Sequence, residues 1–229
     1  MNAVDLIIKS ANAFYAESQT IADSRYRSWG HCYKCFHDAR NDSSPDYDYL
    51  SLHLAFYLAS WGMYRGSSFL LQKDYKVHVP VVKELLKPQY DCLAGIKCVE
   101  LLHAVPLAIL ERLNGFIGKY YDPIRGSVKG GEIKNEISLV LTTKILMGTL
   151  GCVPAYDRYF IDGVRALKVA AGNYNVRSLH ELAGFYERHR AKFEKVRNQM
   201  RVHGLPYPQM KLLDMGFWQY GLSNDGKKG

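Results

Sequence analysis

Apolar residues recur every three or four positions along most of this chain, which is the spacing of a helix that buries one face. The stripe is clearest in NEISLVLTTKILMGTL, where Ile137, Val140, Leu141 and Ile145 fall on one side. Together with prolines and capping residues, the pattern predicts helices over 5–16, 26–39, 51–71, 81–86, 90–103, 106–117, 135–150, 159–171, 178–202 and 206–221.

A few segments depart from the helical pattern. NDSSPDYD at 41–48 is a loop of turn formers, and GKYYDPIRGSVKGG at 118–131 is glycine-rich and irregular. The best strand candidate is KVHVPVV at 76–82, and the helix over 51–71 is expected to bend at one of its glycines. We therefore predict an all-α protein, long enough to bury one large core or two small lobes around a shared cleft.

Composition and charge favour a soluble protein with a polyanionic partner. Hydrophobic residues make up 48% and charged residues 23% of the chain, which argues against wholesale disorder. Thirty Lys and Arg against 22 Asp and Glu give a net charge of +8. Basic surface releases counterions when it meets phosphate, so nucleic acid is the expected partner.

No segment predicts a membrane or export signal. The N-terminus reads as an amphipathic helix without a signal peptide's basic start and apolar core. The most apolar run, Leu50 to Leu71, contains His53 and Arg65, which are costly inside a bilayer. We expect a buried helix there, no membrane partner and a cytoplasmic location.

The cysteines and the standard motifs predict no metal and no cofactor. Cys32 and Cys35 form a CxxC in GHCYKCFH, but a closed zinc site needs four ligands, and Cys92 and Cys98 are too widely spaced to complete it. A helix edge with two half-buried thiols is the favoured alternative. Phosphate loops, dinucleotide fingerprints, HExxH and GxSxG are absent.

One stretch does indicate chemistry: S-x4-TK-x-L-x4-G-x2-P-x2-D, from Ser138 to Asp157. A helix runs into a short loop, Pro154 follows, and an acid stands at the start of the next helix. Asp157 can be an ordinary N-cap, which is worth about 1 kcal/mol. It can equally be a functional carboxylate among aromatic neighbours.

This element resembles the active site of the helix–hairpin–helix DNA glycosylases, which include the 8-oxoguanine and adenine glycosylases. Pro154 and Asp157 match the P-x2-D spacing of the adenine-glycosylase branch, and the likeness covers about Ser138 to Phe160. It is similar also to small bacterial proteins assigned the 8-oxoguanine-glycosylase fold. The resemblance implies a single helical glycosylase domain over 1–229, with lobes of about 1–120 and 121–229 around a cleft.

The implied activity is excision of a damaged or modified base, in repair or in defence against phage, by a monomer whose partner is DNA. Asp157 would be the catalytic carboxylate. Bifunctional members carry a lysine where this chain has Ser138, which cannot form a Schiff base, so a monofunctional enzyme is implied. Lys144 is a secondary candidate, either electrostatic or nucleophilic; alternatively it is a lysine that snorkels from a buried helix.

Further roles follow from residue type and from the resemblance. Trp61, Tyr64, Arg65 and Tyr156 are candidates for the base pocket, although Trp61 is equally suited to core packing. Arg65, a cation in an apolar run, needs a partner such as Asp157, a core carboxylate or a phosphate. The candidates for DNA-backbone contacts are Gly130, Gly131, Ser138 and Arg158.

Two other classes of function remain open. A non-catalytic helical DNA-binding protein would use the same scaffold and charge without releasing a base. A structural or partner-binding protein would use Asp157 only as a cap. The basic residues between 187 and 201 fit either a solvated helix face or phosphate binding.

Overall fold

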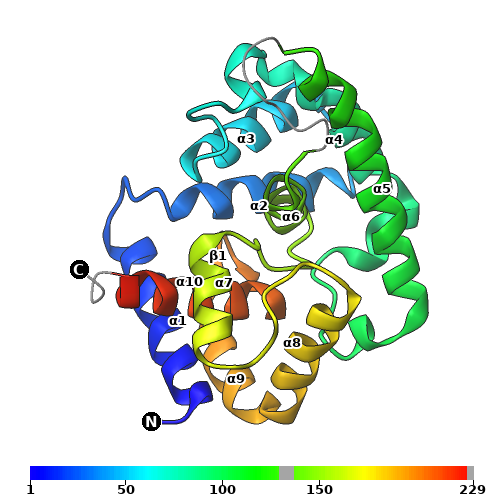
Figure 1. Cartoon of the computed structure of the whole chain (residues 1–229). Helices are drawn as coiled ribbons and strands as arrows, with labels where there is room; N and C mark the ends of the chain where they lie inside the picture. The colour runs from blue at the N-terminus through cyan, green and yellow to red at the C-terminus, as the bar shows by residue number, and fades with distance from the viewer. Residues whose placement is uncertain (129–136, 226–229) are drawn as a thin grey trace.

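The computed structural model describes residues 1–128 and 137–225, most of which are helical (Figure 1). The first half contains α1 (Ala3–Thr20), α2 (Arg27–Ala39), α3 (Tyr47–Ser60), η1 (Phe69–Gln72), η2 (Tyr75–His78), α4 (Val79–Leu85), η3 (Pro88–Leu93), η4 (Glu100–Leu102) and α5 (Ala104–Gly126), where η marks a 3-10 helix. The second half contains α6 (Leu139–Thr149), α7 (Arg158–Ala166), α8 (Val176–Arg188), α9 (Arg190–Arg197), β1 (Arg201–Val202), β2 (Leu205–Pro206) and α10 (Gln209–Asp225). The predicted helical character is confirmed for this part of the chain, with one short antiparallel hairpin added.

The helices form an upper and a lower group with α2 and α6 between them (Figure 1). The upper group contains α3, α4 and part of α5, and the lower group contains α1 and α7 to α10. In the lower group, α10 packs against both α7 and α1. Buried apolar side chains from all these helices belong to one continuous core.

Helix α6 passes through the centre of the molecule. It packs against α2, α3 and α5, and every residue from Leu141 to Thr149 is buried. A helix that is apolar on nearly all sides needs neighbours on all sides, which explains this central place. It ends at Thr149, and Gly151 just beyond its C-cap has a φ of 64°, a left-handed conformation that glycine adopts without strain. The chain then turns toward α7.

The predicted long helix over 51–71 is wrong in its second half. Helix α3 ends at Ser60, and both Gly62 and Gly66 take positive φ, 75° and 57°. Left-handed residues cannot continue a right-handed helix, so the chain forms a loop and then η1. The strand predicted over 76–82 is also wrong: η2 and α4 occupy it, with a proline in the first turn of α4.

Three further boundaries differ from the predictions. Two 3-10 helices replace the helix over 90–103, because Gly95 interrupts it with a φ of 62°. Helix α5 continues to Gly126 through the segment expected to be irregular, since Ile117 and Tyr121 extend its buried stripe. The predicted helix over 178–202 is two helices, α8 and α9, separated at His189 and followed by β1.

Within the described residues, no helix combines the length and the apolar composition needed to cross a bilayer. The segment expected to be a buried helix rather than a membrane span begins with α3, which carries a buried face of Leu50, Leu54 and Leu58.

Candidate active site

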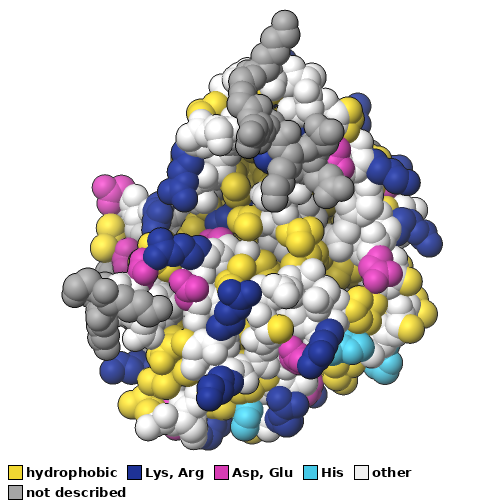
Figure 2. Space-filling view, in the orientation of Figure 1, with side chains coloured by type: hydrophobic (Ala, Val, Ile, Leu, Met, Phe, Trp, Pro, Cys, Tyr) yellow, Lys and Arg dark blue, Asp and Glu magenta, His cyan; other side chains and the backbone are white. Residues whose placement is uncertain are grey.

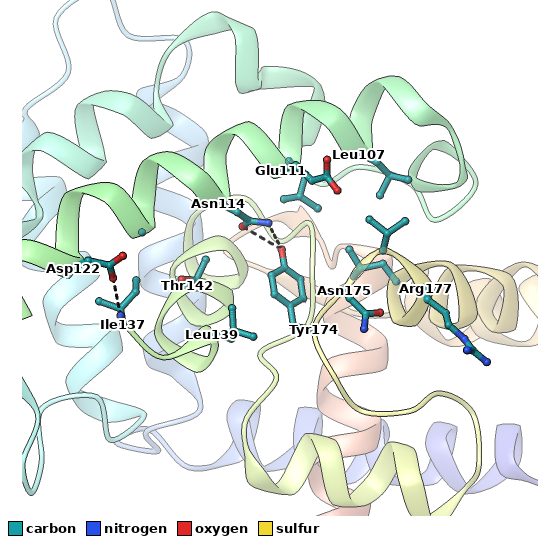
Figure 3. Close-up of a pocket in the computed structure, with 14 residues that line it drawn as sticks. Leu107, Glu111, Asn114, Asp122, Ile137, Leu139, Thr142, Tyr174, Asn175 and Arg177 are labelled. Carbon is teal, nitrogen blue, oxygen red and sulfur yellow. Dashed lines mark hydrogen bonds between the residues drawn. The ribbon is translucent and has the colours of Figure 1, made fainter. Parts of the chain in front are cut away.

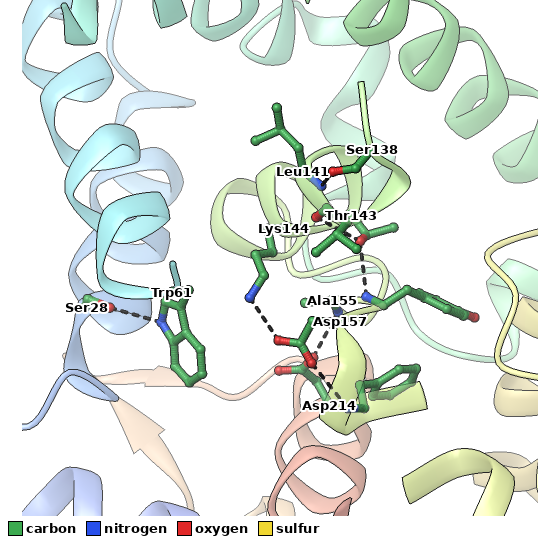
Figure 4. Close-up of polar contacts among 12 residues, drawn as sticks. Ser28, Trp61, Ser138, Leu141, Thr143, Lys144, Ala155, Asp157 and Asp214 are labelled. Atoms are coloured by element: carbon green, nitrogen blue, oxygen red, sulfur yellow. Dashed lines mark hydrogen bonds and ion pairs between the residues drawn. The ribbon is translucent and has the colours of Figure 1, made fainter. Parts of the chain in front are cut away.

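The structure brings Asp157 and Lys144 together (Figure 4). Lys144 projects from the middle of α6, and its Nζ donates to Asp157 Oδ2 at 2.9 Å. The side chains are only 4% and 17% exposed, so this is a nearly buried ion pair. Such a pair loses hydration on both sides, and the mutual attraction offsets that loss only when the geometry is good.

The loop before α7 fixes the direction of the Asp157 carboxylate. Oδ1 accepts a hydrogen bond from Phe160 N–H at 3.2 Å, so Asp157 is the N-cap of α7. Its own N–H donates to Ala155 O at 2.7 Å, and Tyr156 N–H donates to Thr143 Oγ1 on α6 at 3.1 Å. The cap predicted from the sequence is therefore confirmed, and the same carboxylate also faces a cleft.

That cleft has a volume of about 400 Å³ and lies where the upper helices meet α7 and α10. It is lined by Arg25, Trp61, Gly62, Met63, Arg65, Val140, Lys144, Asp157, Arg158, Tyr159 and Trp218. The predicted residues Trp61, Arg65 and Arg158 thus stand with Asp157 and Lys144. Figure 2 shows Lys and Arg side chains along this side of the molecule, from the upper helices down to α7.

Two tryptophans form the aromatic part of the cleft. Trp61 and Trp218 meet edge to face, with ring centroids 5.3 Å apart, and Trp61 also stacks on Tyr26. Trp61 Nε1 donates to Ser28 Oγ at 3.1 Å, which fixes its ring. Lys144 Nζ and the Arg25 guanidinium each lie 5.3 Å from the Trp61 ring. The wall is therefore rigid, aromatic and close to positive charge.

Cations outnumber carboxylates in the cleft. Arg158 pairs with Asp225 at 2.6 Å and with Asp162 at 3.8 Å on the outer side. Within the described chain, Arg25 and Arg65 have no carboxylate within 4.0 Å, although the Arg25 guanidinium rests on aromatic rings. Donors of this kind at the rim of a cleft suit an anionic ligand.

Other predicted site residues lie elsewhere. Tyr64 turns away from the cleft, and its hydroxyl hydrogen-bonds to His78 Nε2 at 2.7 Å. Tyr156 is 2% exposed, and its hydroxyl pairs with Ser178 Oγ on α8. Ser138 caps α6 by accepting from Leu141 N–H, and it does not line the cleft. Gly130 and Gly131 lie outside the described residues.

The sequence reasoning did not identify three residues that belong here. Arg25 lies in an irregular segment that no pattern singled out. Trp218 packs in the core, at 4% exposure, and its ring also lines the cleft. Asp214 lies directly behind Asp157 in Figure 4. An acid inside the apolar run MKLLDMGFW was the available signal, since buried carboxylates need a partner.

Tyr57 lines one small internal cavity together with Asp157 and Asp214, and it is buried. Burial raises the pKa of its hydroxyl well above the ordinary value, and the charges of Asp214 and Asp157 add to this. Tyr57 therefore remains a neutral phenol at any physiological pH.

The cysteines do not assemble a metal centre among the described residues, where no group of three or more His, Cys, Asp or Glu side chains is placed to hold an ion. The prediction of two half-buried thiols is correct for Cys35 and wrong for Cys32, which faces the core from α2 and is buried. Burial raises the pKa of the Cys32 thiol well above its usual value, so this sulfur is not poised as a ligand or nucleophile.

A second cavity, of about 600 Å³, lies on the other side of α6 (Figure 3). Its walls come from α5, α6 and the start of α8, and they combine leucines with polar side chains such as Glu111 and Asp122. Asn114 and Tyr174 hydrogen-bond across it at 2.9 Å. Asp157 and Lys144 do not line it.

In comparisons with known proteins, no family model, no curated protein and no solved structure matches this chain.

Proposed function

We propose that this protein is a monofunctional DNA glycosylase of the helix–hairpin–helix class, which hydrolyses the bond between a damaged or modified base and its deoxyribose. The observation that carries the proposal is the Asp157 carboxylate, which caps α7, pairs with Lys144 and lines an aromatic cleft rimmed by cations. The order of elements supports it, because α6, a short loop with Pro154 and an acid at the head of α7 follow one another as the sequence resemblance implies.

The chemistry needs a fixed carboxylate in a dry site. When the C1′–N bond breaks, its electron pair leaves with the base and positive charge develops on the sugar. Asp157, placed beside C1′, stabilises that charge and orients a water molecule whose oxygen then bonds to C1′. The water loses one proton as its oxygen bonds to C1′, and the departing base takes up one proton, so the products are the free base and an abasic sugar. Ser138 offers no amine, and the Lys144 amine in the cleft is engaged by Asp157, so water is the nucleophile in this proposal.

The cleft also suits an extruded base. An enzyme that acts on a base inside duplex DNA must take it out of the stack and hold it between apolar or aromatic surfaces. Trp61 and Trp218 supply such surfaces next to Asp157. Arg25, Arg65 and Arg158 at the rim can neutralise phosphates on either side of the extruded nucleotide.

Incubation with a panel of duplexes tests the proposal. Each duplex carries one lesion or one phage-type modified base, and alkali then converts abasic sites into strand breaks. The wild-type protein is expected to yield alkali-dependent breaks with at least one duplex, and Asp157→Asn is expected to yield none while still binding DNA. Asp162→Asn is the matched control, because Asp162 is a more exposed carboxylate (43%) outside the cleft. A fully active Asp157→Asn protein would contradict the assignment.

Lys144 provides a second test on the same duplexes. A monofunctional enzyme requires alkali for strand breakage, and Lys144→Met should not change that requirement. Breakage without alkali that Lys144→Ala abolishes would instead make Lys144 the nucleophile of a lyase.

A non-catalytic DNA-binding protein is the second candidate, and the closed ion pair favours it. The Lys144 ammonium donates to Asp157 Oδ2, as it would in an ion pair with a purely structural role. This protein would shift DNA in a gel with steep salt dependence and release no base from any duplex of the panel.

A further inference from the structure

A second buried ion pair lies directly beneath the cleft. Lys211 and Asp214, one turn apart on α10, are joined by 2.8 Å between Nζ and Oδ2, with side chains 3% and 8% exposed. Both pairs line the same small cavity of about 10 Å³. A buried ion pair is by itself weak evidence for stability, because desolvation offsets the attraction. Its place behind Asp157 therefore points to another role.

Asp214 connects α10 to the loop that carries Asp157. While Oδ2 accepts from Lys211, Oδ1 accepts from Ala155 N–H at 2.9 Å (Figure 4). Ala155 O in turn accepts from Asp157 N–H at 2.7 Å. Two consecutive hydrogen bonds thus run from Asp214 to the backbone of Asp157.

Lys211 holds Asp214 and also lies against the cleft wall. Its Nζ is 4.9 Å from the Trp29 ring, 5.1 Å from the Phe14 ring and 5.9 Å from the Trp61 ring. Cation–π contacts with these rings stabilise the side of the Lys211 ammonium that does not face the Asp214 carboxylate. The Lys211–Asp214 ion pair therefore connects α10 both to the Trp61 ring in the cleft wall and to the loop that carries Asp157.

We propose that Asp214, held by Lys211, is a positioning residue that sets the place of the Asp157 carboxylate in the cleft. The proposal rests on the proposed function, since it concerns the same site. Its physical basis is that a displacement of about 1 Å in a catalytic group can lower a rate by about 100-fold. Asp214 does not line the cleft itself, so it acts through the loop.

Two charge-neutral double variants separate the hydrogen bond from the charges. Lys211→Met with Asp214→Asn removes both charges and keeps an oxygen for Ala155 N–H. Lys211→Met with Asp214→Leu removes both charges and that oxygen. Neither leaves a buried charge without a partner, which would unfold the site for unrelated reasons.

The first readout is amide hydrogen exchange at Tyr156 and Asp157, which is independent of any activity. We expect about tenfold or faster exchange at these two amides in the Met/Leu variant, and wild-type exchange in the Met/Asn variant. Equal exchange in both variants would overturn the proposal.

The second readout uses two synthetic duplexes that need no knowledge of the excised base. The cationic duplex contains a pyrrolidine abasic nucleotide, whose ring nitrogen carries the charge of the transition state, and the neutral duplex contains tetrahydrofuran at the same position. We expect the Met/Leu variant to lose about 10- to 100-fold of the wild-type preference for the cationic duplex, and the Met/Asn variant to retain it. If a folded Met/Leu variant kept the full wild-type preference for the cationic duplex, Asp214 would have only a structural role and the proposal would be overturned.

The control is Glu194→Gln with Arg197→Met, which removes a comparable pair on α9, 2.6 Å apart and outside the cleft. It should lower the melting temperature and leave both readouts unchanged. If the wild-type protein itself shows no preference for the cationic duplex, the proposed function fails. The exchange result then decides alone whether Asp214 holds the loop.

Discussion

Asp157 serves α7 and the cleft with different oxygens. Oδ1 caps the helix through Phe160 N–H, and Oδ2 accepts from Lys144. Helix starts favour negative charge, because unpaired N–H groups and the helix dipole meet there. The position that holds a cap in place therefore also suits a fixed carboxylate for catalysis, and the two readings of this residue do not exclude each other.

Two substitutions at Asp157 should separate the stability that comes from the capping hydrogen bond from the stability that comes from the negative charge. Asp157→Asn keeps an oxygen for Phe160 N–H, whereas Asp157→Ala removes it, and both leave Lys144 without its partner. We therefore expect Asp157→Ala to be less stable than Asp157→Asn by about 1 kcal/mol in the free energy of unfolding. Urea unfolding followed by circular dichroism measures the difference. Equal midpoints and slopes would show that the cap contributes nothing.

The contact between α7 and α10 sets the second wall of the site. A Cβ added at Gly221 would lie 2.0 Å from Tyr159 O, and one added at Gly163 would lie 2.1 Å from Phe217 O. Both glycines thus allow the two helix backbones to touch. This approach brings Trp218 of α10 beside Tyr159 near the start of α7.

Gly221→Ala should consequently destabilise the protein by about 1–3 kcal/mol, because the obstructing atom belongs to the backbone. Gly115→Ala is the matched control: Gly115 lies in α5, and a Cβ there meets nothing within 4 Å. It should raise stability by about 0.5–1 kcal/mol, since alanine favours a helix interior. Thermal melting of the three proteins tests this pair, and a neutral Gly221→Ala would contradict the close crossing.

The sequence predicted helices well where their apolar stripe and caps agreed. The helix of α6 and the cap at Asp157 are examples. It failed where a glycine adopts a left-handed backbone, as at Gly62 and Gly95, because periodicity does not reveal φ. The 201–206 hairpin, with two residues per strand, is too short to show an alternating pattern.

The site was also only partly predictable, because local sequence patterns do not reveal how the helices pack. Asp157, Lys144 and Trp61 come together because α3, α6 and α7 meet, and no local pattern encodes that meeting. Tyr64 has the right residue type, but Gly62 turns the chain so that its side chain faces His78. Residue type therefore identified candidates, while the tertiary arrangement selected among them.

At the scale of the whole molecule, the basic excess gives a measurable expectation. Arg25 and Arg65 stand at the rim of the cleft, so their joint replacement by alanine should lower the slope of log K against log salt by about 2 units for duplex DNA. Arg188→Ala on α8, away from the cleft, is the control and should leave the slope unchanged. Fluorescence anisotropy at several salt concentrations provides the slopes. A slope that Arg188→Ala lowers just as much would place the DNA elsewhere.

His78 should make the folded molecule sensitive to acid. Its ring lies between the hydroxyls of Tyr64 and Tyr121, and burial lowers its pKa from 6.5 to about 3. Because the folded pKa is the lower one, protonation favours the unfolded chain. The contribution of His78 is fully present above about pH 6.5 and is lost as the pH falls toward 3.

Each pH unit in that window should cost up to about 1.4 kcal/mol of unfolding free energy from this residue. His78→Asn removes the titrating group, so its stability should fall less steeply between pH 7 and pH 5. Urea unfolding across that range compares the two proteins. Parallel pH profiles would mean that His78 is not the buried base described above.

The central claim is that the Asp157 carboxylate stabilises positive charge on a sugar in the cleft. Competition binding of the cationic and neutral duplexes measures this without knowledge of the base. Wild-type protein is expected to prefer the cationic duplex by about 100-fold, and Asp157→Asn should lose that preference while Asp162→Asn keeps it. Equal binding of both duplexes by the wild-type protein would contradict the claim.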